Sequence, residues 1–63
     1  MIVRFIEVGR MKKSWETETP ELTYEWLYGQ VKKNGALMSS DIEFYEDGVI
    51  TAGLRTVGRF EIL

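Results

Sequence analysis

The chain contains neither cysteine nor histidine. The missing cysteine excludes disulfide bonds, and the two absences together exclude every common zinc arrangement. They also remove the side chains that most often act as nucleophile or general base, so we expect a non-enzymatic protein without catalytic, cofactor or metal sites. The lack of cysteine fits a cytoplasmic location, which is the location we expect.

Long apolar runs are absent as well. No segment approaches the roughly 20 apolar residues that a membrane span needs, and Arg4 and Glu7 interrupt the apolar start of the chain, unlike a signal peptide. We therefore expect no membrane partner. Eight basic and ten acidic side chains give a net charge of −2, which opposes a general attraction to nucleic-acid phosphates.

With 63 residues the chain is expected to form a single domain, 1–63, near the lower size limit for independent folding. Domains this small often gain stability from disulfides, a bound metal or a second subunit. Since the composition excludes the first two, we expect a homodimer.

One helix is predicted from Thr19 to Gly35. Thr19 can accept hydrogen bonds from the first free N–H groups, and Pro20 suits the first helical position. Asn34 followed by Gly35 predicts a left-handed residue that ends the helix. The apolar side chains of this segment cover a wide arc of the helix surface. Such an arc indicates burial in a sheet or contact with a partner chain. The arc comprises Leu22, Tyr24, Trp26, Leu27, Tyr28 and Val31.

The first strand is predicted at Ile2–Val8. Its apolar side chains fall on both faces, which is typical of a strand inside a sheet, and covering both faces needs more than one helix. A two-residue Gly9-Arg10 turn would return Met11–Thr17 antiparallel, with Arg4 opposite Trp15. The residues just after that turn suit a loop equally well.

A second hairpin is predicted around Gly48, with two possible registers. A two-residue turn would mix apolar and polar side chains on both faces, whereas a three-residue loop, Glu46 to Gly48 with Gly48 left-handed, separates them. We therefore predict the three-residue loop. It collects Ile42, Phe44, Ile50 and Ala52 on one face.

The last strand is predicted at Arg59–Ile62, after a turn or bend at Gly53 and a bulge at Gly58. The two glycines have the spacing of a phosphate-binding loop, but Arg59 and Phe60 stand where that loop needs lysine and serine or threonine. We predict an α+β fold, with one helix packed across a small antiparallel sheet of four to five strands, in the order β-β-α-β-β-β.

Two tryptophans and three tyrosines are many for so small a core. Because these residues often anchor protein interfaces, we expect a protein-interaction module of adaptor or inhibitor type that binds another protein. The candidate partner-binding residues are Phe5, Trp15, Tyr28 and Tyr45. Core filling is the competing interpretation of the same aromatic residues.

The alternative is a nucleic-acid-binding module that uses a sheet face. Arg4, Lys13 and Trp15 would lie together there, with Arg55 or Arg59 nearby. The small number of cations and the net negative charge make nucleic acid the less favoured partner. Two acidic runs, at Glu16–Glu25 and Asp41–Asp47, suit contact with a basic groove on another protein, although a solvated surface is the simpler interpretation.

Overall fold

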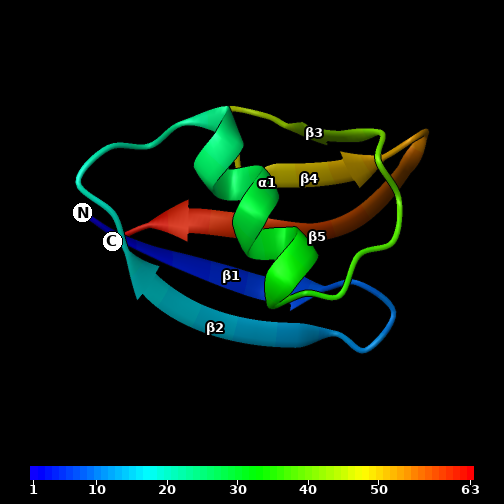
Figure 1. Cartoon of the computed structure of the whole chain (residues 1–63), viewed down its shortest axis with the longest axis horizontal. Helices are drawn as coiled ribbons and strands as arrows, with labels where there is room; N and C mark the ends of the chain where they lie inside the picture. The colour runs from blue at the N-terminus through cyan, green and yellow to red at the C-terminus, as the bar shows by residue number, and fades with distance from the viewer.

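The computed structural model describes all 63 residues, and its single helix lies across one face of a five-stranded antiparallel sheet (Figure 1). The strand order in the sheet is β2-β1-β5-β4-β3, and the predicted α+β fold and element order are confirmed. The helix has ten residues, which is too short to cross a bilayer. The elements are β1 (Ile2–Val8), β2 (Lys13–Glu18), α1 (Tyr24–Lys33), β3 (Ile42–Phe44), β4 (Val49–Ala52) and β5 (Arg55–Ile62).

Strand β1 lies inside the sheet, between β2 and β5, as its doubly apolar sequence predicts. Val3, Phe5 and Val8 are fully buried. Val8 reaches the same face as Phe5 because the β1–β2 register shifts between these two residues, at a bulge in which Glu7 takes a φ of +48°. A regular strand would have turned Val8 to the other face with Ile6.

The first hairpin differs from the prediction by one residue. Arg4 pairs with Glu16, and Phe5 pairs with Trp15, whereas a Gly9-Arg10 turn would have set Arg4 opposite Trp15. The connection is longer, from Gly9 to Lys12, and the Glu7 bulge adds a further residue to β1. A slip of one residue exchanges the two faces of a strand, so the tryptophan turns toward the helix.

The helix begins later than predicted. Thr23 is the N-cap, and its side chain accepts a hydrogen bond from the Trp26 N–H at 3.1 Å. Thr19 is buried instead: its N–H donates to the Met1 carbonyl at 3.0 Å, and its hydroxyl donates to the Glu21 carbonyl at 2.8 Å. Because Thr19 continues the pairing of β2 with the start of β1, it is not available to begin the helix.

The end of the helix also differs in detail. Asn34 caps it in a right-handed conformation, and the left-handed residue is Ala36, with a φ of +55°. Gly35 is required for space rather than for its backbone angle, because a Cβ there would lie 2.7 Å from Val8 Cγ1. The glycine therefore allows the helix end to approach β1.

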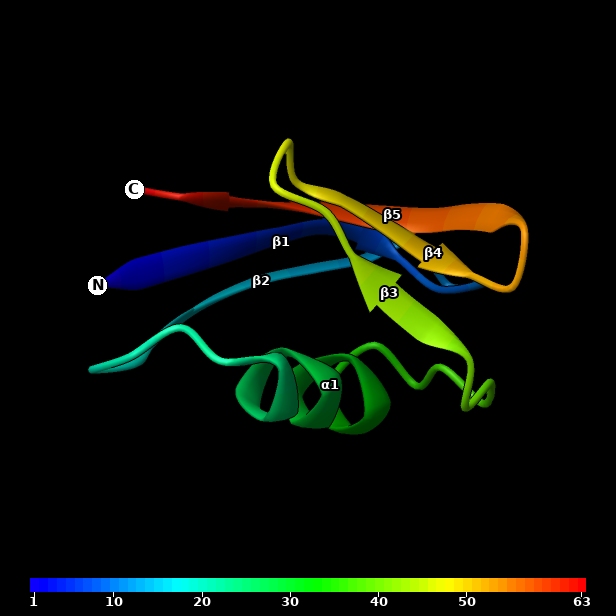
Figure 2. The same ribbon diagram turned by 90° about the horizontal axis from the view of Figure 1, so that it is seen from above.

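The second hairpin has the predicted three-residue loop. Ile42 pairs with Ala52, Phe44 pairs with Ile50, and Gly48 has a φ of +93°. The resulting apolar face joins the core beneath the helix, and the other face of the sheet is left without a covering layer (Figure 2). The buried core consists of Val3, Phe5, Val8, Leu27, Val31, Leu37, Ile42 and Ile50.

Candidate interaction surface along strand β2

The sheet has two free edges, and they are not equivalent. Strand β3 has three residues, and the hydroxyl of Tyr24 on the helix donates to the Ile42 carbonyl at 2.8 Å. Strand β2 has six residues and forms the outermost strand at the opposite margin (Figure 1). The helix thus occupies part of one edge and leaves the other longer and more accessible.

The backbone groups that face outward from β2 follow from its pairing with β1. Met1 and Thr19 exchange two hydrogen bonds, with the Met1 ammonium donating to the Thr19 carbonyl at 2.9 Å. Hydrogen bonding alternates along an antiparallel strand, so the odd-numbered residues of β2 bond to β1. The N–H and C=O groups of Ser14, Glu16 and Glu18 consequently point to the free edge.

Trp15 lies on the helix side of this edge and is half-buried. Its ring stacks on Phe5 of the neighbouring strand, with centroids 4.7 Å apart and planes 15° apart. The indole N–H donates to Gln30 Oε1 at 3.1 Å, and Asn34 Nδ2 donates to the same oxygen at 2.9 Å. These contacts fix the indole while leaving part of it at the surface.

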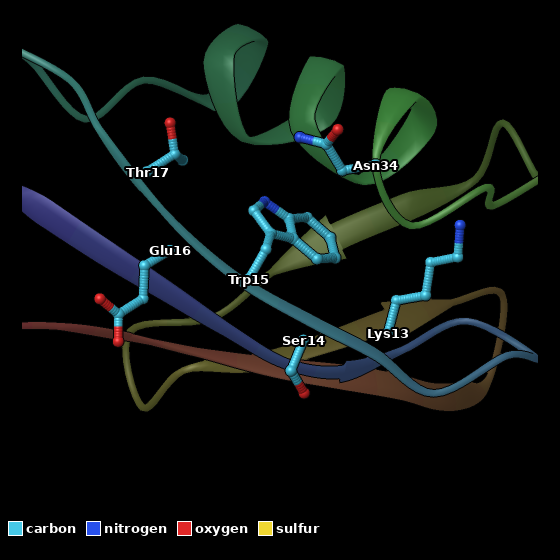
Figure 3. A pocket seen from close by; sticks show the side chains of 6 residues that line it. All are labelled: Lys13, Ser14, Trp15, Glu16, Thr17 and Asn34. Carbon is cyan, nitrogen blue, oxygen red and sulfur yellow. The ribbon is translucent and has the colours of Figure 1, made fainter.

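A hollow of about 480 Å³ opens along β2 beside this indole (Figure 3). Five of its six lining residues are polar, and Trp15 is the only hydrophobic one. The hollow therefore combines one aromatic surface with hydrogen-bonding groups next to a free strand edge. It is lined by Lys13, Ser14, Trp15, Glu16, Thr17 and Asn34.

The open face of the sheet carries a charge network across three strands. Arg4 Nε donates to Glu16 Oε2 at 2.9 Å, and Arg4 Nη1 donates to Glu61 Oε1 at 3.1 Å. The hydrogen bond to Glu16, supported by the charges of both carboxylates, raises the pKa of Arg4 above its ordinary value. Arg4 is therefore already neutralised by its neighbours, whereas Arg59, which is paired with Ile6 on the same face, forms no salt bridge.

The four aromatic residues predicted to bind a partner do not share one surface. Phe5 is fully buried and offers no area to a partner, whereas Trp15 borders the hollow. Tyr28 is half-buried, with Lys32 Nζ 5.7 Å from its ring centroid. Tyr45 is exposed beyond β3, away from β2. Only Trp15 contributes to the β2 edge.

The hydroxyl of Tyr45 donates to Glu43 Oε1 at 2.6 Å. This hydrogen bond favours the protonated phenol and raises the pKa of Tyr45 above its ordinary value of 10.0. The pair is exposed on the surface next to β3. The hydrogen bond therefore links two neighbouring surface side chains.

Neither the backbone of β2 nor the two polar side chains that position its tryptophan, Gln30 and Asn34, could be recognised as part of a site from the sequence. Helical spacing places Gln30 one turn before Asn34, but nothing in the sequence shows that β2 lies beneath this end of the helix. Strand order decides which edge is free, and strand order depends on long-range pairing of β1 with β5.

A second hollow, of about 720 Å³, lies among the loops at one end of the sheet. Arg10, Lys12 and Arg55 line it, and none of them forms a salt bridge, because both salt bridges of the chain belong to Arg4. Exposed Met11 and Met38 border the same space. Three cations without a carboxylate partner therefore share this end of the molecule.

Comparison with protein-family models, with curated proteins and with solved structures gave no match. Function is therefore inferred from the geometry of these surfaces.

Proposed function

We propose that the chain is a small non-enzymatic protein-interaction module of adaptor or inhibitor type that acts in the cytoplasm. Its β2 edge accepts an extended segment of a partner protein as an additional strand. The observation that carries this proposal is the contrast between the two edges: Tyr24 covers part of β3, whereas β2 is six residues long and turns the backbone groups of three of them outward. Strand addition draws its affinity from such main-chain hydrogen bonds.

Specificity would come from the side chains along the edge. The hollow beside Trp15 suits a flat or aliphatic side chain of the added segment, which would pack on the indole. Lys13 stands at one end of β2 and Glu18 at the other, so an antiparallel segment with complementary charges would be held in one register. Segments with the reverse charge order would be rejected.

The charged residues of β2 also protect it from indiscriminate pairing. Natural edge strands commonly carry charges that discourage contact with other sheets, and Glu16 and Glu18 serve this purpose on the open face. Arg4 holds Glu16 in place. A partner must therefore match the charge pattern, which favours a specific segment over general aggregation.

The experiment compares two substitutions at one edge residue. Twelve-residue peptides selected from a random display library on the wild-type chain serve as probes, and their affinities are measured by titration calorimetry. Glu16→Ala removes the carboxylate but keeps the outward N–H, whereas Glu16→Pro removes both, and proline is tolerated at strand edges.

We expect Glu16→Pro to weaken binding at least about tenfold beyond Glu16→Ala, through the lost main-chain bond and the altered edge. Glu61→Ala is the matched control, because it removes the other carboxylate bound to Arg4 away from the edge. Equal binding by the proline and alanine variants would rule out strand addition at β2.

A nucleic-acid-binding function is the second candidate, and the second hollow is the observation that favours it. The predicted grouping of Arg4, Lys13 and Trp15 on one sheet face is wrong, because Lys13 and Trp15 lie on the helix side and Arg4 lies on the open face. The open face receives little support for this role, because Arg4 already pairs with two carboxylates there and leaves only Arg59 unpaired.

The loop end, with Arg10, Lys12 and Arg55, is the better location for phosphate contacts. Titration of labelled single- and double-stranded oligonucleotides at low salt tests it, and binding that weakens steeply with salt and is lost in Arg55→Glu would support it.

A further inference from the structure

We propose that the strand added to β2 is β2 of a second copy of this chain, joined antiparallel about a two-fold axis that passes beside Trp15. This inference rests on the proposed function, since it uses the same edge. The two five-stranded sheets would become continuous, and both helices would cover the same face. Such pairing buries the free main-chain groups of both copies at once.

The alternation of hydrogen bonds limits the possible registers. Ser14, Glu16 and Glu18 carry the outward backbone groups, so each of them must stand opposite an outward residue of the second copy. Registers that oppose Glu16 to the second copy's Glu16 or Glu18, or that oppose the two copies of Glu18, place like charges directly across the strands, which is destabilising. Those registers are excluded on charge.

Two registers remain, and they differ in overlap. Placing Ser14 opposite the second copy's Ser14 pairs only the first residues of β2, from Lys13 to Trp15. Placing Ser14 opposite the second copy's Glu16 overlaps Lys13 to Thr17 and brings no like charges together. The longer overlap forms more main-chain bonds, so this register is the one the edge favours.

In the favoured register the two copies of Trp15 face each other across the axis. They occupy a position without main-chain hydrogen bonds, where opposing side chains approach most closely. Each indole would enter the hollow beside the other, and the stacking on Phe5 already holds it in one orientation. On the same face Lys13 stands opposite the second copy's Thr17.

Self-pairing and binding of a foreign segment exclude each other, because both use the same backbone groups. The dimer would therefore protect the edge until a better-matched segment displaces the second copy. Apparent affinity for such a segment falls as the concentration of the chain rises.

The pairing of Lys13 with Thr17 gives a test that is specific to this register. Thr17→Glu would set a carboxylate opposite each Lys13, and Thr17→Lys would set a second ammonium there. Two symmetric pairs of this kind change the dimer dissociation constant by about two- to thirtyfold, tighter for glutamate and weaker for lysine. Sedimentation equilibrium measures the constants, and circular dichroism confirms that each variant folds.

The double variant Lys13→Glu with Thr17→Lys should restore dimerisation, because it exchanges the two charges of each pair. Rescue supports the register, since in the shorter register residue 17 faces residue 11 instead. A wild-type chain that remains monomeric at millimolar concentration would overturn the inference, as would equal dimerisation of the two Thr17 variants. Peptide binding that depends on Glu16 would still stand in either case, which separates this result from the proposed function.

Discussion

The indole of Trp15 stacks almost parallel on the ring of Phe5, with centroids 4.7 Å apart. Phe5 is fully buried and Trp15 is half-buried, so this cross-strand pair joins the core to the β2 edge. A side chain that binds at the hollow would therefore touch a group whose orientation the core has already fixed. Little conformational entropy remains to be lost at this position on binding.

Replacing this tryptophan tests the link between edge and core. Trp15→Ala should lower the free energy of unfolding by about 3 kcal/mol, the lower end for a large aromatic residue because part of the ring is exposed. Trp15→Phe keeps the stacking on Phe5 and loses the hydrogen bond to Gln30, so it should cost less. Urea unfolding measures the free energy of unfolding of both variants. Equal losses of stability in the two variants would contradict the stacking as the main contribution of Trp15 to stability.

Gly58 lies so close to β1 that a side chain at this position would collide with it. A Cβ there would lie 2.8 Å from Val8 Cγ2 and 2.9 Å from Val8 Cα, so Gly58→Ala should destabilise the fold by about 1–3 kcal/mol. Gly29 is the control, since a Cβ there meets nothing within 4 Å and it lies inside the helix. Gly29→Ala should add about 0.5–1 kcal/mol of stability. Thermal unfolding measures the change in stability for both substitutions. Changes of the same sign would contradict this packing.

The position of the helix start gives another prediction. Thr23→Ala removes the cap that accepts from the Trp26 N–H and should cost about 1 kcal/mol, whereas Thr23→Ser should cost little. Urea unfolding monitored by helical circular dichroism gives the values. A Thr23→Ala variant as stable as the wild type would show that the helix starts elsewhere.

The Tyr45–Glu43 hydrogen bond predicts a pH effect at alkaline pH. Because the bond raises the pKa of Tyr45, the stability it contributes is fully present below the unfolded-state value of about 10 and is lost as pH rises through the folded value. Absorbance at 295 nm follows the phenol. Glu43→Gln should lower the titration midpoint of Tyr45, and an unchanged midpoint would exclude the carboxylate as the cause.

Local sequence patterns predicted the parts of the fold that depend on neighbouring residues. The register of the second hairpin followed from separating apolar from polar side chains around Gly48, and the interior position of β1 followed from its two apolar faces. The first hairpin could not be predicted in the same way. Its bulge places Glu7 at a φ of +48°, which its side chain does not favour, and this bulge brings Val8 into the core.

The helix start and the candidate site depended on contacts between distant residues. Thr19 and Thr23 are equally good caps in isolation, and the pairing of Thr19 with Met1 decides between them. The β2 edge likewise exists only because β5 pairs with the other side of β1. Trp15 was among the candidate residues, but its role beside a free edge required the order of the strands.

Amide hydrogen exchange at Ser14, Glu16 and Glu18 is the most direct test of β2 as an open edge that accepts a strand. In dilute solution these three amides should exchange fast while the amides of Trp15 and Thr17 are protected. The amides of Ser14 and Glu16 should slow together when a second copy binds, because the favoured register overlaps Lys13 to Thr17, and Glu18 should slow as well when a selected peptide covers the whole edge. Protection of the three amides in the dilute monomer, or fast exchange of Ser14 and Glu16 in the complex, would contradict strand addition at β2.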